Sequence, residues 1–164
     1  MIGGGIKVVQ RVFYRLIVLT AVSVIMLALP FWFQTEQKQV LSTMGKYTEQ
    51  CFYSHGEFQD YTDFAVYLCP AAEMAKNPIF SPVSEADMDT ISAFLDNFEE
   101  WIAVFKSNDP QDALVRNYAF DRSVIDSSDY FYIAESKDYP KFGCYDVWFF
   151  DTRTMTLYYF HNNI

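Results

Sequence analysis

Four acidic residues at helical spacing are the first candidates for a functional site: Asp89, Asp96, Glu99 and Glu100. They lie in a segment, Ser84 to Lys106, whose apolar residues recur every three or four positions. A helix with this spacing would project the four carboxylates largely from the side opposite its apolar face. The ordinary alternative is a solvated helix face, but such a stripe also attracts basic partners. The sequence therefore predicts a protein-binding site on this helix.

Cysteine is the second residue type that could do chemistry. Cys51, Cys69 and Cys144 all follow the apolar N-terminal run, and an oxidising compartment would permit a disulfide among them. Three cysteines allow three single pairings, and we favour Cys51 with Cys69 because both fall in the predicted helical first half. Cys144 has no adjacent His or Arg to stabilise a thiolate, so we interpret it as a small buried residue.

Other catalytic and cofactor patterns are missing from the sequence. His55 and His161 have no metal-ligand spacing, and the acids alternating from Glu85 to Asp89 lack the glycine and final glutamate of a calcium loop. No G-x-S-x-G nucleophile elbow occurs. We therefore expect no metal or cofactor, and we do not expect an enzyme.

The charge is distributed unevenly along the 164 residues. All 21 acidic residues lie beyond position 34, whereas three of the 12 basic residues, Lys7, Arg11 and Arg15, precede it. The remaining nine basic residues against 21 acidic ones give that part a formal charge of −12. Such a field repels nucleic acid and favours basic partners, so we exclude nucleic-acid binding.

The segment from Leu16 to Phe33 contains no charged residue and is long enough to cross about 30 Å of hydrocarbon. The three preceding basic residues predict that the N-terminus stays in the cytoplasm. A cleaved secretory signal is the rival interpretation, but bulky Leu29 and Phe31 do not suit the cleavage site. We predict a cytoplasmic leader over residues 1–15, a transmembrane signal anchor over 16–33, a stalk helix over 34–53 and an exported acidic domain over 54–164. This order predicts a bacterial inner-membrane protein whose domain lies in the periplasm.

Helices are predicted to dominate the first two thirds of the chain. Val40, Met44, Tyr47 and Cys51 have the spacing of the stalk helix, and Phe58–Lys76 has a similar spacing that Pro70 interrupts. These two segments account for the predicted helical first half.

Capping residues indicate where the next two predicted helices begin. Ser84 and Asp87 resemble a capping box at the start of the Ser84–Lys106 helix. A further helix is predicted to begin at Asp109 as N-cap, with Pro110 in the first position, and to end near Tyr118. Two consecutive capped helices suggest a helical hairpin.

Strands are predicted only near the C-terminus. The runs Tyr130–Ile133, Tyr145–Phe150 and Thr156–Phe160 are rich in aromatic and β-branched residues. The sequence therefore predicts an α+β fold of three to four helices followed by a C-terminal three-stranded antiparallel β-meander. Alternation is poor in these runs, so the sheet is either covered on both faces or presents one face to a partner.

These features predict a membrane-anchored binding or inhibitor protein, such as an immunity protein that neutralises a secreted toxin. Its partner would be a basic or soluble exported protein. The alternative is a non-catalytic accessory subunit of a bacterial envelope assembly for secretion, division or conjugation. An accessory subunit would associate with integral membrane proteins, whereas an inhibitor would bind a soluble foreign one.

Overall fold

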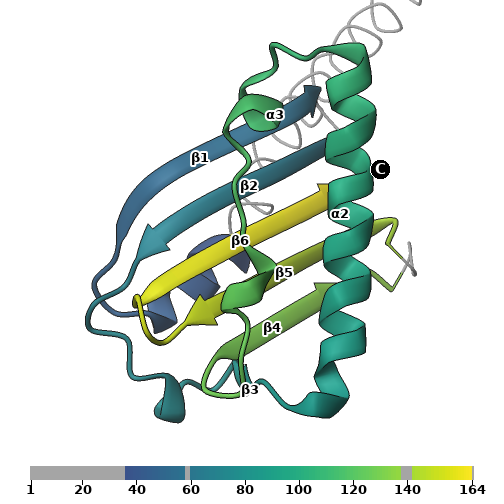
Figure 1. Ribbon diagram of the computed structural model, residues 1–164. Coiled ribbons are helices and arrows are strands. Elements are labelled where there is room, and N and C mark those ends of the chain that lie inside the picture. Colours follow the sequence, from purple (N-terminus) through teal and green to yellow (C-terminus); the bar gives the residue numbers. More distant parts are fainter. Residues whose placement is uncertain (1–35, 58–59, 138–141, 164) are drawn as a thin grey trace, which may run out of the picture. The chain divides into compact units, whose positions relative to one another are not determined.

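The chain forms two compact units, Met1–Ser42 and Thr43–Ile164. The computed structural model describes residues 36–57, 60–137 and 142–163 (Figure 1). All the strands that the structure describes lie in the second unit.

The predicted cytoplasmic leader over residues 1–15 and the predicted anchor over residues 16–33 lie outside the described residues. Within the described ranges, no helix is both long enough and apolar enough to cross a membrane. The prediction of a transmembrane helix therefore has no counterpart in the part of the chain that the structure describes.

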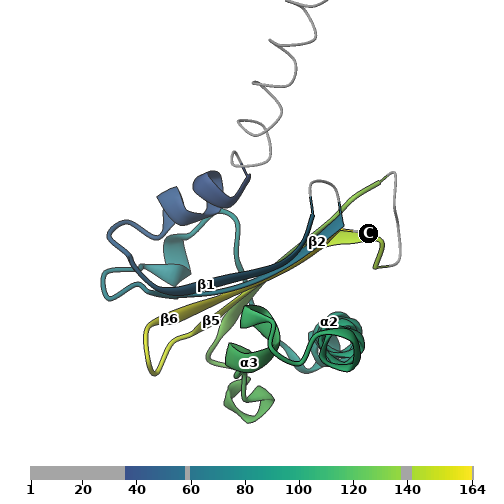
Figure 2. The same cartoon turned by 90° about the horizontal axis from the view of Figure 1, so that it is seen from above.

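A six-stranded antiparallel sheet is the centre of the second unit. Its strand order is β1-β2-β6-β5-β4-β3. The strands are β1 (Thr48–Glu57), β2 (Asp60–Leu68), β3 (Ser81–Pro82), β4 (Tyr130–Glu135), β5 (Cys144–Asp151) and β6 (Thr156–Asn163). The helices are α2 (Met88–Asn108) and α3 (Ala113–Asn117), with 3-10 turns η1 (Met74–Lys76), η2 (Glu85–Asp87) and η3 (Arg122–Val124). Figures 1 and 2 show α2 and α3 on the same face of the sheet.

The predicted fold of three to four helices and a three-stranded meander is wrong. The three predicted strand runs lie in β4, β5 and β6, but these strands make only half of the sheet. β2 pairs with β6 along its length, and this pairing joins the β1–β2 hairpin to the C-terminal strands. Among residues 44–163 as described, the only α-helices are α2 and α3.

The stalk helix predicted over residues 34–53 is wrong beyond residue 43. Residues 36–43 are helical, but Gly45 has a φ of 68° and β1 begins at Thr48. A residue in this left-handed conformation commonly ends a helix, and glycine adopts it without strain. The predicted domain boundary between residues 53 and 54 therefore cuts through β1.

The helix predicted over Phe58–Lys76 is also wrong, because β2 occupies Asp60–Leu68. The residues Thr62 to Ala65 are buried in succession, since this inner strand is covered on both faces. A strand buried on both faces does not alternate between apolar and polar residues. Its run of apolar residues therefore matched helical spacing by coincidence.

The helix predicted over Ser84–Lys106 corresponds to η2 and α2. Its capping box is confirmed, with the Ser84 amide donating to Asp87 at 3.1 Å. The next helix begins later than predicted, at Ala113 rather than near Asp109. Asp112 is the N-cap because its carboxylate accepts hydrogen bonds from two amides of the first turn.

Aromatic side chains fill the space between α2 and the sheet. Phe98 is fully buried, and its ring centre lies 5.4 Å from that of Phe160 on β6. Tyr118, after α3, contacts the same ring of Phe98 at 5.5 Å. Packing from two directions fixes the rotation of α2, so that its acidic side faces away from the sheet.

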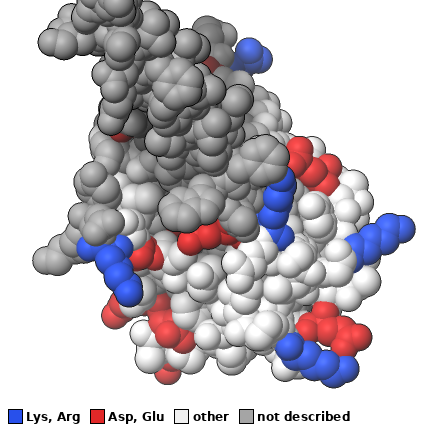
Figure 3. All heavy atoms as spheres, turned by 180° about the vertical axis from the view of Figure 1, so that it is seen from behind, with Lys and Arg blue, Asp and Glu red and all other residues white. Residues whose placement is uncertain are grey.

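The second face of the sheet also carries buried aromatic rings. Trp148 stacks on Tyr159 at 4.1 Å, and Tyr67 and Trp148 are each only 1% exposed. The sheet is therefore covered on both faces. Seen from behind the sheet, the described surface is mostly uncharged, with acidic and basic groups scattered over it (Figure 3).

Candidate protein-binding site

The predicted site residues all lie on α2, and three of them lie on the side opposite its buried face. Asp89, Asp96 and Glu100 are exposed and follow one another at spacings of seven and four residues. Glu99 is half-buried at the edge of this stripe. The structure therefore places the four carboxylates on one helix, but in two different environments.

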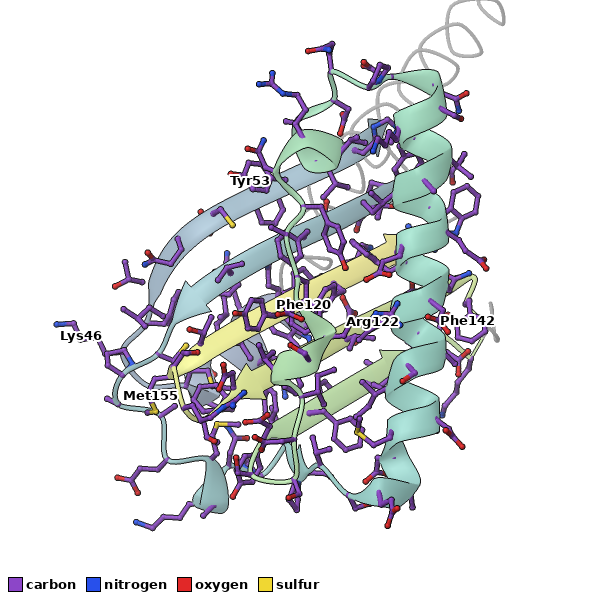
Figure 4. The ribbon with its side chains drawn as sticks, viewed as in Figure 1. Lys46, Tyr53, Phe120, Arg122, Phe142 and Met155 are labelled. Atoms are coloured by element: carbon purple, nitrogen blue, oxygen red, sulfur yellow. The ribbon has the colours of Figure 1, made fainter. Side chains whose placement is uncertain are left out.

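Arg122 neutralises two of these acids. Its Nη2 atom lies 2.9 Å from Glu99 Oε2, and its Nη1 atom contacts Asp96. The Tyr118 hydroxyl donates a further hydrogen bond to Glu99 at 2.9 Å. Asp89 and Glu100 have no such partner among the described residues, so they are the carboxylates left for a ligand. Figure 4 shows Arg122 beside α2, in the segment that follows α3.

An open groove lies on the other flank of α2. Its lining comprises Asp89, Thr90, Ala93 and Phe94 of α2 together with Glu135 and Phe142. The rings of Phe94 and Phe142 meet edge to face, with centres 4.9 Å apart. Figure 4 shows Phe142 and Arg122 on opposite sides of α2. The groove therefore combines an aromatic wall with two carboxylates, next to the exposed acidic stripe.

The backbone at Phe142 is unusual for a residue with a side chain. Its φ is 73°, and its amide donates to Glu135 Oε1 at 3.4 Å. Such conformations carry strain and persist where surrounding contacts hold them. The contact with Phe94 is one such restraint, and it keeps the Phe142 ring against α2.

A row of ionisable side chains crosses the second face of the sheet. Asp63, His161 and Asp146 are cross-strand neighbours on β2, β6 and β5. His161 Nδ1 lies 2.9 Å from Asp146 Oδ1, and the Tyr159 hydroxyl donates to the same oxygen at 2.6 Å. Sequence reasoning missed this row because its members are far apart in the chain and form no motif. Only the strand register brings them together.

The Asp146–His161 pair resembles the carboxylate and histidine of a general base. However, Asp63 and His161 are each only 7% exposed, so a substrate could not reach them. Asp63 Oδ1 and His161 Nε2 are buried without a hydrogen-bond partner among the described residues. We therefore assign this row a structural role rather than a catalytic one.

Asp63 predicts a pH-dependent effect on stability. Burial raises the pKa of its carboxyl group, and this effect outweighs the hydrogen bond from Ser54 and the nearby His161, which both lower it. An acid with a raised pKa in the folded state favours folding at low pH, and this contribution is lost as the pH rises through the folded pKa. We expect Asp63→Asn to become more stable relative to the wild type as the pH rises from below 3.8 to 7.

Denaturant unfolding of both proteins at a series of pH values measures this difference. Asp60→Asn, at an exposed position on the same strand, is the matched control. A difference between Asp63→Asn and the wild type that does not change with pH would contradict the prediction.

The predicted disulfide pair is not brought together, and none of the three cysteines forms a disulfide. Cys51 lies opposite Val66 in the β1–β2 pairing, and its side chain packs on the α2 side of the sheet. Cys69 lies two residues after Tyr67, whose side chain is on the other face of the sheet. Cys69 is three residues beyond Val66, the partner of Cys51, so the two cysteines are displaced by roughly 10 Å along the strands. A disulfide requires Cα atoms within about 7 Å.

His55 on β1 contacts α2 and the residue that caps α3. Its Nδ1 atom lies 2.9 Å from Asp112 Oδ2, and its ring stacks on Phe105 at 3.9 Å. Among the described residues, no group of three His, Cys, Asp or Glu side chains could hold a metal ion. No family model, curated protein or solved structure matches this chain.

Proposed function

We propose that this protein is a binding or inhibitor protein that captures a basic protein partner on the outer side of α2. The mode of action would be that of an immunity protein neutralising a secreted toxin. The observation that supports this most is the pair of exposed carboxylates, Asp89 and Glu100, which have no partner in the described structure and lie on the helix that forms one wall of the groove.

Electrostatics explain why the partner should be basic. The chain beyond residue 34 carries a formal charge of −12, which accelerates the encounter with a cationic protein. After the encounter, the exposed carboxylates and the aromatic groove would provide short-range contacts. A bacterial periplasmic location stays a prediction from the charges that flank residues 16–33.

The contacts of the four acids on α2 determine which of them a binding test can change. Replacing Asp96 or Glu99 by lysine would put a second cation beside Arg122 and lower the stability of the fold. A loss of binding in such a variant could not be distinguished from this loss of stability. The test therefore uses the double variant Asp89→Lys, Glu100→Lys in the full chain. The matched control reverses two exposed acids on β1 and β2, Glu49→Lys and Asp60→Lys, which gives the same change in net charge.

Immobilised full-length wild-type and variant proteins are incubated with competitor-cell secretions and with envelope extracts, and the retained proteins are identified by mass spectrometry. We expect one soluble basic protein to bind the wild type and the control. The double variant should bind it at least about tenfold more weakly, a loss of about 1.4 kcal/mol. Unfolding curves of the three proteins check that folding is unchanged.

Two results would contradict the proposal. Equal weakening by the control would show that only net charge matters and that the α2 surface is not the site. Stoichiometric retention of integral membrane proteins in place of a soluble one would favour the alternative function, an accessory subunit of an envelope assembly.

A further inference from the structure

We infer that the groove between α2 and Phe142 receives an arginine side chain of the protein partner. This inference rests on the proposed function and adds the identity of the residue that anchors the partner. The groove is lined by three apolar side chains, Ala93, Phe94 and Phe142, and by three polar ones, Asp89, Thr90 and Glu135. Its occupant must satisfy both kinds of surface.

Charge complementarity excludes most side chains. An acidic side chain would be repelled by the carboxylate of Asp89, and a purely apolar one would remove water from this carboxylate without replacing its hydrogen bonds. A second copy of this chain is disfavoured because each copy carries the same excess of negative charge. A cationic side chain with an apolar stem satisfies both the Asp89 carboxylate and the aromatic wall.

Arginine fits this groove better than lysine. Its guanidinium group is planar, stacks on aromatic rings and donates several hydrogen bonds in fixed directions. Phe142 is only partly buried, so part of its ring is open to such stacking, while Phe94 beneath it is 8% exposed. Lysine would bring a compact, strongly hydrated charge that gains less from an aromatic wall.

The position of the groove connects it with the acidic stripe. Asp89 belongs to both, since it lines the groove and begins the series that continues through Asp96 to Glu100. One arginine in the groove would therefore place neighbouring basic residues of the partner near the stripe. Buried arginine anchors surrounded by weaker polar contacts are typical of protein interfaces.

Titration of the isotope-labelled full chain with N-acetyl-arginine amide, followed by amide NMR shifts, tests the inference. The citrulline derivative has the same shape without the charge, and the lysine derivative has the charge without the planar group. We expect saturable shifts at Thr90, Ala93, Phe94 and Phe142 with the arginine derivative, much weaker ones with lysine and none with citrulline. Loss of one charged hydrogen-bond partner in Asp89→Asn should raise the apparent Kd about tenfold.

Two further variants separate the aromatic wall from the general negative charge. Phe142→Leu keeps an apolar side chain but removes the ring, so it should weaken the arginine derivative and leave the lysine derivative unchanged. Glu100→Gln, outside the groove lining, removes one charge and should change the Kd for arginine much less than Asp89→Asn does. Equal effects of Glu100→Gln and Asp89→Asn would overturn the inference.

The outcomes also separate this inference from the proposed function. Equal binding of the arginine and lysine derivatives, or no binding of arginine, would overturn the arginine receptor. If the arginine receptor were overturned but the Asp89→Lys, Glu100→Lys variant lost capture of a basic protein, the proposed function would stand without an arginine in the groove. Arginine binding in the groove together with capture that this double variant does not affect would overturn the proposed function instead.

Discussion

Phe98→Ala is expected to lower the free energy of unfolding by about 3–5 kcal/mol, a large part of the total stability of a typical domain. The Phe98 ring is fully buried between α2 and the sheet and contacts the rings of Phe160 and Tyr118. Replacing it by alanine removes this contact area and leaves a cavity that the surrounding rings fill only in part. Because these contacts hold α2 on the sheet, the variant should also lose capture of the partner when it unfolds.

Chemical denaturation followed by circular dichroism measures the effect of Phe98→Ala. Phe52→Ala is the matched control, because it removes the same ring from a position on β1 that is 42% exposed. The control should cost much less, since its ring is already largely in water. Similar losses in the two variants would contradict the packing of α2 that the structure describes.

Asp129→Ala is expected to lower the free energy of unfolding by about 2–5 kcal/mol, because two amide donors would lose their acceptor. Asp129 is fully buried just before β4. Its carboxylate accepts hydrogen bonds from the amides of Asp126 and Thr152, each at 2.9 Å. It therefore ties the turn before β4 to the turn between β5 and β6.

Asparagine keeps one of the two acceptor oxygens of the carboxylate, whereas alanine keeps neither. Asp129→Asn should therefore lower the free energy of unfolding less than Asp129→Ala does. Asp60→Ala, at an exposed position, is the control for removing an aspartate as such. Thermal and denaturant unfolding of the four proteins gives the order of stability. A loss in Asp129→Ala no larger than that in Asp60→Ala would show that the two turns are held together by other contacts.

The sequence predicted α2 well because its signals are local. The Ser84–Asp87 capping box and the regular apolar spacing act within a few residues of each other, and no tertiary contact overrides them. The acids that face away from the sheet follow directly from that spacing. Local signals also located the runs that form β4, β5 and β6.

The missing half of the sheet could not be predicted in the same way. β2 is buried on both faces, so its residues do not alternate, and its pairing with β6 spans almost a hundred residues. The partner of Glu99 was missed for the same reason, since Arg122 reaches α2 only through the fold. Phe142 becomes part of the groove because the β4–β5 connection brings it to Phe94.

Reciprocal charge reversal between the chain and its captured partner tests the central claim, binding through the outer side of α2, most directly. The Kd is measured for wild-type and Asp89→Lys, Glu100→Lys chains against the wild-type partner and against partner variants in which basic surface residues are changed to glutamate. We predict that one such partner variant binds the wild-type chain weakly and the double variant more tightly, a coupling that separate sites would not show. Losses that are additive for every partner variant would contradict the claim that Asp89 and Glu100 contact the partner.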